Sequence, residues 1–134
     1  MEYELAEELP SVEDYQQLRV AAGLSAKSAE AAARGLAGSW YGVTIRRDES
    51  VIGMGRIIGD GGCFFQIVDI AVLPAHQGRG LGRRIMAALM ERLDAYAPAT
   101  ALVTLLADGD AQQLYQKFGF ELSAPASVGM LRRL

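Results

Sequence analysis

The 134-residue chain has one cysteine, one histidine and no excess of basic residues. The lone Cys63 excludes an internal disulfide, and the sequence has no Cys/His cluster of the kind that binds a metal ion. The formal net charge of −3 argues against binding to nucleic acid through a basic surface. No apolar run approaches the roughly 20 residues that cross a bilayer, and the acidic residues 2–8 are unlike a secretory signal. We therefore expect a cytoplasmic protein without a metal, nucleic-acid or membrane partner.

Two common nucleotide-binding motifs are also missing. A P-loop needs Gly-Lys-Ser/Thr, and that tripeptide does not occur in the chain. A dinucleotide fingerprint needs three glycines in the pattern G-x-G-x-x-G, but Arg83 stands at the third position when the count starts at Gly78. Ile85 stands there when the count starts at Gly80. Nucleoside-triphosphate and nicotinamide sites of these two kinds are therefore excluded.

The chain does have a composition of 51% hydrophobic and 22% charged residues, which is typical of a globular protein. Its length suits one domain over residues 1–134. The alternation of short apolar runs and amphipathic stretches predicts an α/β fold.

A glycine-rich segment, QGRGLGRR over residues 77–84, is the most distinctive part of the sequence. It follows an apolar run that predicts a strand and precedes an amphipathic stretch, residues 81–97, that predicts a helix. The first turn of a helix has unpaired N–H groups and a partial positive charge. Glycine leaves room for an anion beside these groups, and the arginines add charge. The segment therefore predicts a phosphate-binding site, although a glycine-rich turn can also be only a tight connection.

The phosphate loop and a later segment together resemble a known family. Gln77-x-x-Gly80-x-Gly82, after a strand that ends in Val-x-Pro, resembles the acetyl-coenzyme A pyrophosphate loop of the GNAT N-acetyltransferases. Residues 111–120, AQQLYQKFGF, are similar to the N-x-x-A-x-x-L-Y-x-x-x-G-F segment of the same family. The chain departs from this pattern at Asp108, where the family usually has asparagine. A carboxylate cannot donate the hydrogen bond that this amide gives to the pantetheine arm.

The resemblance implies a mixed sheet of about seven strands, flanked by about four helices. We expect antiparallel N-terminal strands, followed by two parallel strands joined by a helix. The patterns predict strands at residues 3–5, 40–46, 51–58, 63–72, 101–106, from 120, and at 130–134. They predict helices at residues 11–22, 26–36, 81–97 and 108–118, the first two capped by Ser11 and Ser25. The apolar run 101–106 is expected to be buried on both faces.

The resemblance also implies where acetyl-CoA binds. In the family the two parallel strands splay apart and the acyl arm inserts between them, where free main-chain amides bind it. The implied cofactor-binding residues in this chain are Ile70, Ala71, Val72, Gln77, Gly78, Arg79, Gly80, Leu81, Gly82, Arg83, Asp108 and Tyr115.

Two residues are candidates for catalysis. Tyr115 is placed to donate a hydrogen bond to the departing thiolate. Full proton transfer is uphill by about 2 kcal/mol, because an ordinary tyrosine pKa exceeds that of a thiol. The alternative is a tyrosine that only packs in a helix. Asp69, on the strand before the phosphate loop, is a candidate general base acting through a water, or a carboxylate that faces a helix dipole or an arginine.

Three further residues have simple interpretations. We expect His76 to be exposed to solvent and Cys63 to be a small buried side chain. Trp40 is expected either to line the acceptor pocket or to cover the core.

These features predict an N-acetyltransferase that uses acetyl-CoA and no metal. A bound primary amine of a small molecule or peptide would attack the thioester directly, because no cysteine or serine is placed to become acylated. The acidic net charge favours a cationic acceptor. The resemblance also implies a homodimer, because the C-terminal strands leave sheet edges that a twofold partner could cover. The alternative is a module that binds acyl-CoA without turnover, as a sensor or interaction domain.

Overall fold

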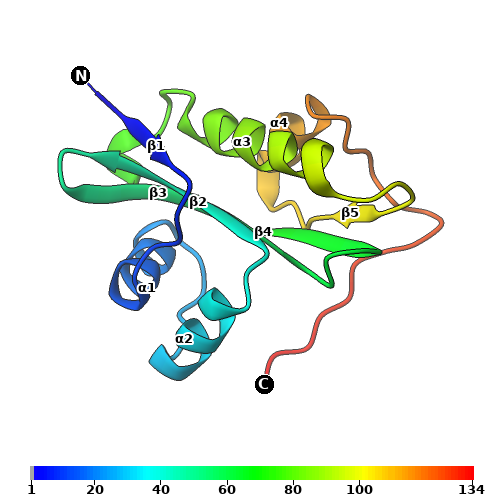
Figure 1. Ribbon diagram of the computed structural model, residues 1–134, viewed down its shortest axis with the longest axis horizontal. Coiled ribbons are helices and arrows are strands. Elements are labelled where there is room, and N and C mark those ends of the chain that lie inside the picture. The colour runs from blue at the N-terminus through cyan, green and yellow to red at the C-terminus, as the bar shows by residue number, and fades with distance from the viewer. Residues whose placement is uncertain (1) are drawn as a thin grey trace.

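The computed structural model describes residues 2–134, in which five strands form one mixed sheet (Figure 1). The strands lie in chain order, and the first three pairs are antiparallel while β4 and β5 are parallel. Their bounds are β1 (Glu4–Ala6), β2 (Tyr41–Arg47), β3 (Ser50–Gly59), β4 (Phe64–Val72) and β5 (Leu102–Thr104). The predicted α/β class and the parallel pair are therefore confirmed.

Helices cover both faces of the sheet. The α-helices in residues 2–134 are α1 (Val12–Ala21), α2 (Ala29–Ala37), α3 (Leu81–Tyr96) and α4 (Gln112–Gln116). Short 3-10 helices, Pro74–His76 and Gly109–Ala111, precede α3 and α4. Helix α3 lies on one face, and α1 and α2 lie on the other (Figure 1). No helix within residues 2–134 is long and apolar enough to reach across a bilayer.

Serine caps fix where the first two helices begin. The Ser11 hydroxyl accepts a hydrogen bond from the Asp14 amide at 3.1 Å, as predicted for the start of α1. The cap of α2 is Ser28, whose hydroxyl accepts from the Ala31 amide at 3.1 Å. The prediction of Ser25 as this cap is wrong, because the Ser25 carbonyl and hydroxyl both accept from the Arg19 guanidinium.

Helix α3 contributes the largest part of the core. Ile85, Met86 and Leu89 are fully buried against apolar side chains of β2, β3 and β4. Burying each such side chain stabilises the fold by roughly 1.5–3 kcal/mol. Gly55 of β3 allows the close approach, since a Cβ there would lie 2.5 Å from Cγ2 of Ile85. The sheet that carries the glycine-rich loop is thereby held firmly against α3.

The C-terminal part of the chain differs from the prediction. Residues 117–134 form no strand, so the sheet in the described chain has five strands and the predicted seven is wrong. Strand β5 is also shorter than expected and is not buried on both faces, because Leu102 is 54% exposed. It is an edge strand without a neighbour on its outer side. Ser, Pro and Gly interrupt the segment after Leu122, and proline cannot donate to a strand ladder.

Candidate functional site

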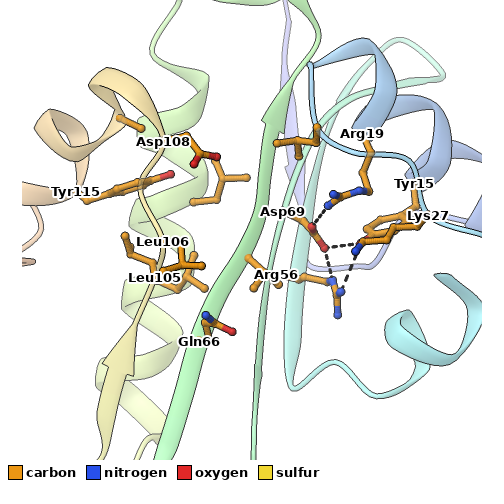
Figure 2. A pocket seen from close by; sticks show the side chains of 15 residues that line it. Tyr15, Arg19, Lys27, Arg56, Gln66, Asp69, Leu105, Leu106, Asp108 and Tyr115 are labelled. Carbon is orange, nitrogen blue, oxygen red and sulfur yellow. Dashed lines mark hydrogen bonds and ion pairs between the residues drawn. The ribbon is translucent and has the colours of Figure 1, made fainter. Parts of the chain in front are cut away.

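Strands β4 and β5 pair over only three residues. The pairs are Phe64 with Leu102, Phe65 with Val103 and Gln66 with Thr104. Beyond Gln66, β4 continues to Val72 while the chain leaves β5, so the two backbones diverge (Figure 2). The β5-facing edge of residues 67–72 therefore has no strand partner, and the expected splay is present.

A cavity of about 500 Å³ occupies this opening. Tyr115, Asp108 and the two leucines after β5 lie on one side of it, and Tyr15, Arg19, Lys27 and Arg56 lie on the other (Figure 2). Residues 66–70 of β4 run between the two groups. The cavity thus joins the α4 side of the sheet to the α1 side.

A β-bulge in β4 places Asp69 in this cavity. Asp69 and Ile70 together stand opposite Gly55, because the register passes from Met54–Ala71 directly to Arg56–Val68. Asp69 has a φ of 61°, a left-handed conformation that aspartate tolerates better than most residues. The bulge turns the carboxylate toward α1 and the Arg56 side chain.

Three side chains donate to the Asp69 carboxylate. Oδ2 accepts from Arg56 Nε at 2.6 Å and from the Tyr15 hydroxyl at 2.7 Å, and Oδ1 accepts from Arg19 Nη1. The Asp69 side chain is only 7% exposed. Burial and the hydrogen bond to Asp69 raise the pKa of Tyr15 above its ordinary value. Asp69 therefore faces arginines, the alternative that the sequence left open.

The two arginines are themselves held in place. Arg19 Nε donates to the Ser25 carbonyl at 2.7 Å, and Arg56 Nη1 donates to the Gly35 carbonyl and the Ser39 hydroxyl, each at 3.1 Å. Tyr15, Arg19 and Arg56 were not predicted as a cluster from the sequence. The available signal was a charged residue on the buried face of an amphipathic helix, four positions after Tyr15.

The glycine-rich loop has unpaired donors. Gly78 and Gly80 have φ values of 78° and 76°, and Gly80 is the N-cap of α3 without a side-chain cap. The backbone N–H groups of residues 78–83 donate to no acceptor among residues 2–134. Gln77 turns back, and its side-chain amide donates to the Val72 carbonyl at 3.0 Å. This arrangement of free N–H groups at a helix start suits a phosphate.

Helix α4 lies beside the start of α3. A Cβ on Gly82 would lie 3.7 Å from Cδ2 of Leu114. Leu114, the residue before Tyr115, therefore lies close to the first turn of α3. Burial raises the pKa of Tyr115, and the nearby Asp108 carboxylate raises it further. The phenol therefore stays protonated at neutral pH and is able to donate a hydrogen bond into the cavity.

The other singled-out residues lie outside the cavity. His76 is partly buried and its Nδ1 is 2.8 Å from the Tyr3 hydroxyl, so the expectation of a solvent-exposed histidine is wrong. Cys63 is exposed, so the expectation of a buried side chain is also wrong. Trp40 packs edge-on against Phe65 and covers the core, with ring centroids 4.7 Å apart. Residues 2–134 contain no group of three or more potential metal ligands.

Comparison with known proteins places these features in a family. Residues 38–122, more than half of the chain, match the family described as Acetyltransferase (GNAT) domain. A chloroplastic GCN5-related N-acetyltransferase 2 of Arabidopsis thaliana is 31% identical over 85 residues. That match covers 63% of this chain and 32% of the relative, so the chain spans about a third of the relative's length.

Solved structures match over nearly the whole chain. A crystal structure of a Staphylococcus aureus protein, described as of unknown function and a probable acetyltransferase, is 43% identical with a TM-score of 0.95. It covers 99% of this chain and 100% of its own. A GNAT-family acetyltransferase of Streptococcus pneumoniae is 25% identical with a TM-score of 0.78, covering 99% of this chain and 98% of its own.

Proposed function

Because the chain belongs to the GNAT acetyltransferase family, we propose that it is an N-acetyltransferase that uses acetyl-CoA. The acceptor is a primary amine that attacks the thioester directly in a ternary complex. The observation that carries this proposal is the cavity between the diverging strands, which has free main-chain donors on one edge and Tyr115 on the other. A thioester needs groups of both kinds for acyl transfer.

The glycine-rich loop is the proposed site for the pyrophosphate of acetyl-CoA. Residues 78–83 offer free N–H groups at the start of α3, and Arg79 and Arg83 are exposed beside them. The unpaired edge of β4 at Ile70, Ala71 and Val72 is the proposed site for the pantetheine arm. Tyr115 and Asp108 line the part of the cavity that the acyl end would reach.

The chemistry follows from this placement. A neutral amine attacks the thioester carbon, the C–N bond forms, and N–H groups of β4 stabilise the oxyanion. The C–S bond then breaks, and the Tyr115 hydroxyl donates a hydrogen bond to the thiolate as charge develops on sulfur. The proton of the amine passes to water. Tyr115 suits this step because it is half-buried and protonated.

Asp69 is better suited to positioning than to accepting that proton. Its oxygens already accept from three donors, two of them guanidinium groups. Proton transfer to this carboxylate would disrupt two buried ion pairs, which is costly. We therefore propose that Asp69 orients Arg19 and Arg56 along the cavity.

A module that binds acyl-CoA without turnover is the second candidate. Asp108, a carboxylate where the family pattern has asparagine, and the full engagement of Asp69 favour it. The amide contact to pantetheine would be absent, and the oxygens of Asp69 are already engaged by three donors instead of being free to act as a base.

One experiment separates the two functions. The protein is incubated with acetyl-CoA and a broad amine panel, and free thiol is followed while calorimetry measures acetyl-CoA binding. The enzyme releases thiol with at least one amine, and Tyr115→Phe lowers kcat by about 100-fold with acetyl-CoA affinity retained. Binding without thiol release supports the module. A protein that does not bind acetyl-CoA contradicts both.

A further inference from the structure

The charges that line the cavity are unlike those of the whole chain. Arg19, Lys27 and Arg56, here called the cationic wall, face two carboxylates, Asp69 and Asp108. The lining therefore has a formal charge of +1, although the chain has −3. The charge of a ligand that a small site favours depends more on the residues that line the site than on the net charge of the chain, because salt screens distant surface charges.

The two arginines of the cationic wall lie largely out of water, whereas Lys27 is exposed. The side chains of Arg19 and Arg56 are 9% and 14% exposed, and both share the one carboxylate of Asp69. Buried charges in proteins are normally paired. Asp69 neutralises only one of these two positive charges, and a bound anion would neutralise the second.

Donors remain available for such an anion. The hydrogen bonds of Arg19 within residues 2–134 use three of its five N–H groups. The ammonium group of Lys27 makes no hydrogen bond or ion pair in the same part of the chain, and Lys27 lines the cavity (Figure 2). Lys27 is exposed and has no part in the Asp69 cluster, so its ammonium group is free to meet a ligand in the cavity.

Charge also divides the cavity in space. The cationic wall comes from α1, β3 and the α1–α2 loop, whereas Tyr115 and Asp108 lie across β4 (Figure 2). A molecule with an amine at one end and an anion at the other matches this division. Its anion would lie on the cationic wall, and its amine would point toward the thioester.

From these observations we infer that the acceptor is a small amine that also carries a carboxylate or phosphate group, bound by Lys27, Arg19 and Arg56. This inference rests on the proposed acetyltransferase function and specifies its substrate class. It replaces the cationic acceptor that the net charge of the chain had suggested. The cavity volume of about 500 Å³, shared with the acyl arm, limits the acceptor to a small molecule or a chain end.

The test compares amines that differ only in the anion. Ethanolamine, serine and phosphoethanolamine share one skeleton, and lysine and cadaverine form a second matched set. With saturating acetyl-CoA, kcat/KM should be at least about tenfold higher for the anionic members. A preference for serine and lysine identifies a carboxylate acceptor, and a preference for phosphoethanolamine identifies a phosphate. Equal or better turnover of ethanolamine and cadaverine overturns the inference.

Variants of Lys27 locate the anion. Lys27→Gln should raise KM for the preferred anionic amine about five- to tenfold, while KM for acetyl-CoA stays unchanged. Lys27→Arg keeps the charge and should restore most of the affinity. Arg34→Gln removes an exposed positive charge on α2 outside the cavity and serves as the control. If Lys27→Gln changes KM equally for the anionic amines and for ethanolamine and cadaverine, which carry no anion, the assignment of Lys27 is wrong.

A binding measurement keeps the two proposals distinguishable. The same amines are titrated into the protein saturated with CoA, and heat is measured. Suppose the anionic members bind this complex more tightly, but no amine releases thiol from acetyl-CoA in the turnover assay. That result refutes the enzyme and leaves the anion site in place. No preference for the anionic members refutes the anion site, whether or not acetyl transfer occurs.

Discussion

At the scale of single residues, the Asp69 carboxylate pairs with two arginines from distant parts of the chain. The sequence identifies Asp69 as a carboxylate on the strand before the glycine-rich loop. Its partners are 50 and 13 positions away in Arg19 and Arg56, and only the bulge in β4 brings the three together. Alternating strand patterns contain no sign of a bulge, which is why the cluster was not predicted.

The Asp69 cluster predicts a stability effect. Asp69→Asn leaves two nearly buried guanidinium groups without their carboxylate and should lower the free energy of unfolding by about 3 kcal/mol. Thermal unfolding should then occur roughly 10 °C lower. Tyr15→Phe removes one neutral donor to the same oxygen and should cost only about 1 kcal/mol. A large loss of kcat at unchanged melting temperature would instead identify Asp69 as the general base.

Asp108 predicts a change in the pH profile. Burial and the Asp108 carboxylate both raise the pKa of Tyr115, so its hydroxyl remains a donor above the pH at which an ordinary tyrosine ionises. Asp108→Asn removes the charge and lowers that pKa toward its ordinary value. Activity that depends on the protonated phenol should therefore decline at a lower pH in Asp108→Asn than in the wild type.

Profiles of kcat against pH from 7 to about 11 check this shift in the alkaline limb. Asp110→Asn, an exposed neighbour in the 3-10 helix that follows Asp108, is the matched control and should leave the limb in place. An alkaline limb that is identical in all three proteins rules out Tyr115 as the titrating donor.

At the scale of elements, the predicted bounds were closest where an apolar stripe or run packs into the core. The apolar stripe of α3 and the apolar run of β4 predicted both elements almost to the residue. The predicted strands at residue 120 and at 130–134 had only scattered apolar residues to support them. Leu122, Met130 and Leu131 are exposed in the described chain, so these side chains give a strand there no core contact.

The contact between α3 and the sheet predicts the effect of added volume. Gly55→Ala would place a Cβ 2.5 Å from Ile85 and 3.3 Å from Leu89, and should destabilise the protein by about 1–3 kcal/mol. Gly62→Ala is the control, because its Cβ would have only an ordinary contact at 3.9 Å with Asp60. Chemical denaturation of both variants measures the difference. Equal stabilities would mean that α3 is free to shift away from β3.

At the scale of the whole molecule, the sheet has an open edge. Strand β5 has no partner on its outer side, and Leu102, Leu122, Val128 and Met130 are exposed in this part of the described chain. A hollow of about 820 Å³ lies between β5, α4 and residues 119–130. Apolar side chains beside an unpaired strand are a common site of association.

We therefore propose a homodimer that covers this edge. Light scattering at micromolar concentration should give about twice the 14.4 kDa mass of the chain. Leu102→Lys, at an edge position that is 54% exposed, should return the mass to that of one chain without loss of folding. Val20→Lys, at an exposed position on α1 away from this edge, is a comparison for added charge alone. A wild-type mass of one chain contradicts the dimer.

The bond between Tyr3 and His76 links the first strand to the segment just before the glycine-rich loop, and Arg84 of α3 adds a second link to the Tyr3 carbonyl. Tyr3 thus joins the segment before the glycine-rich loop to the first turn of α3. If the glycine-rich loop binds acetyl-CoA as proposed, loss of Tyr3 should weaken that binding, although Tyr3 does not line the cavity.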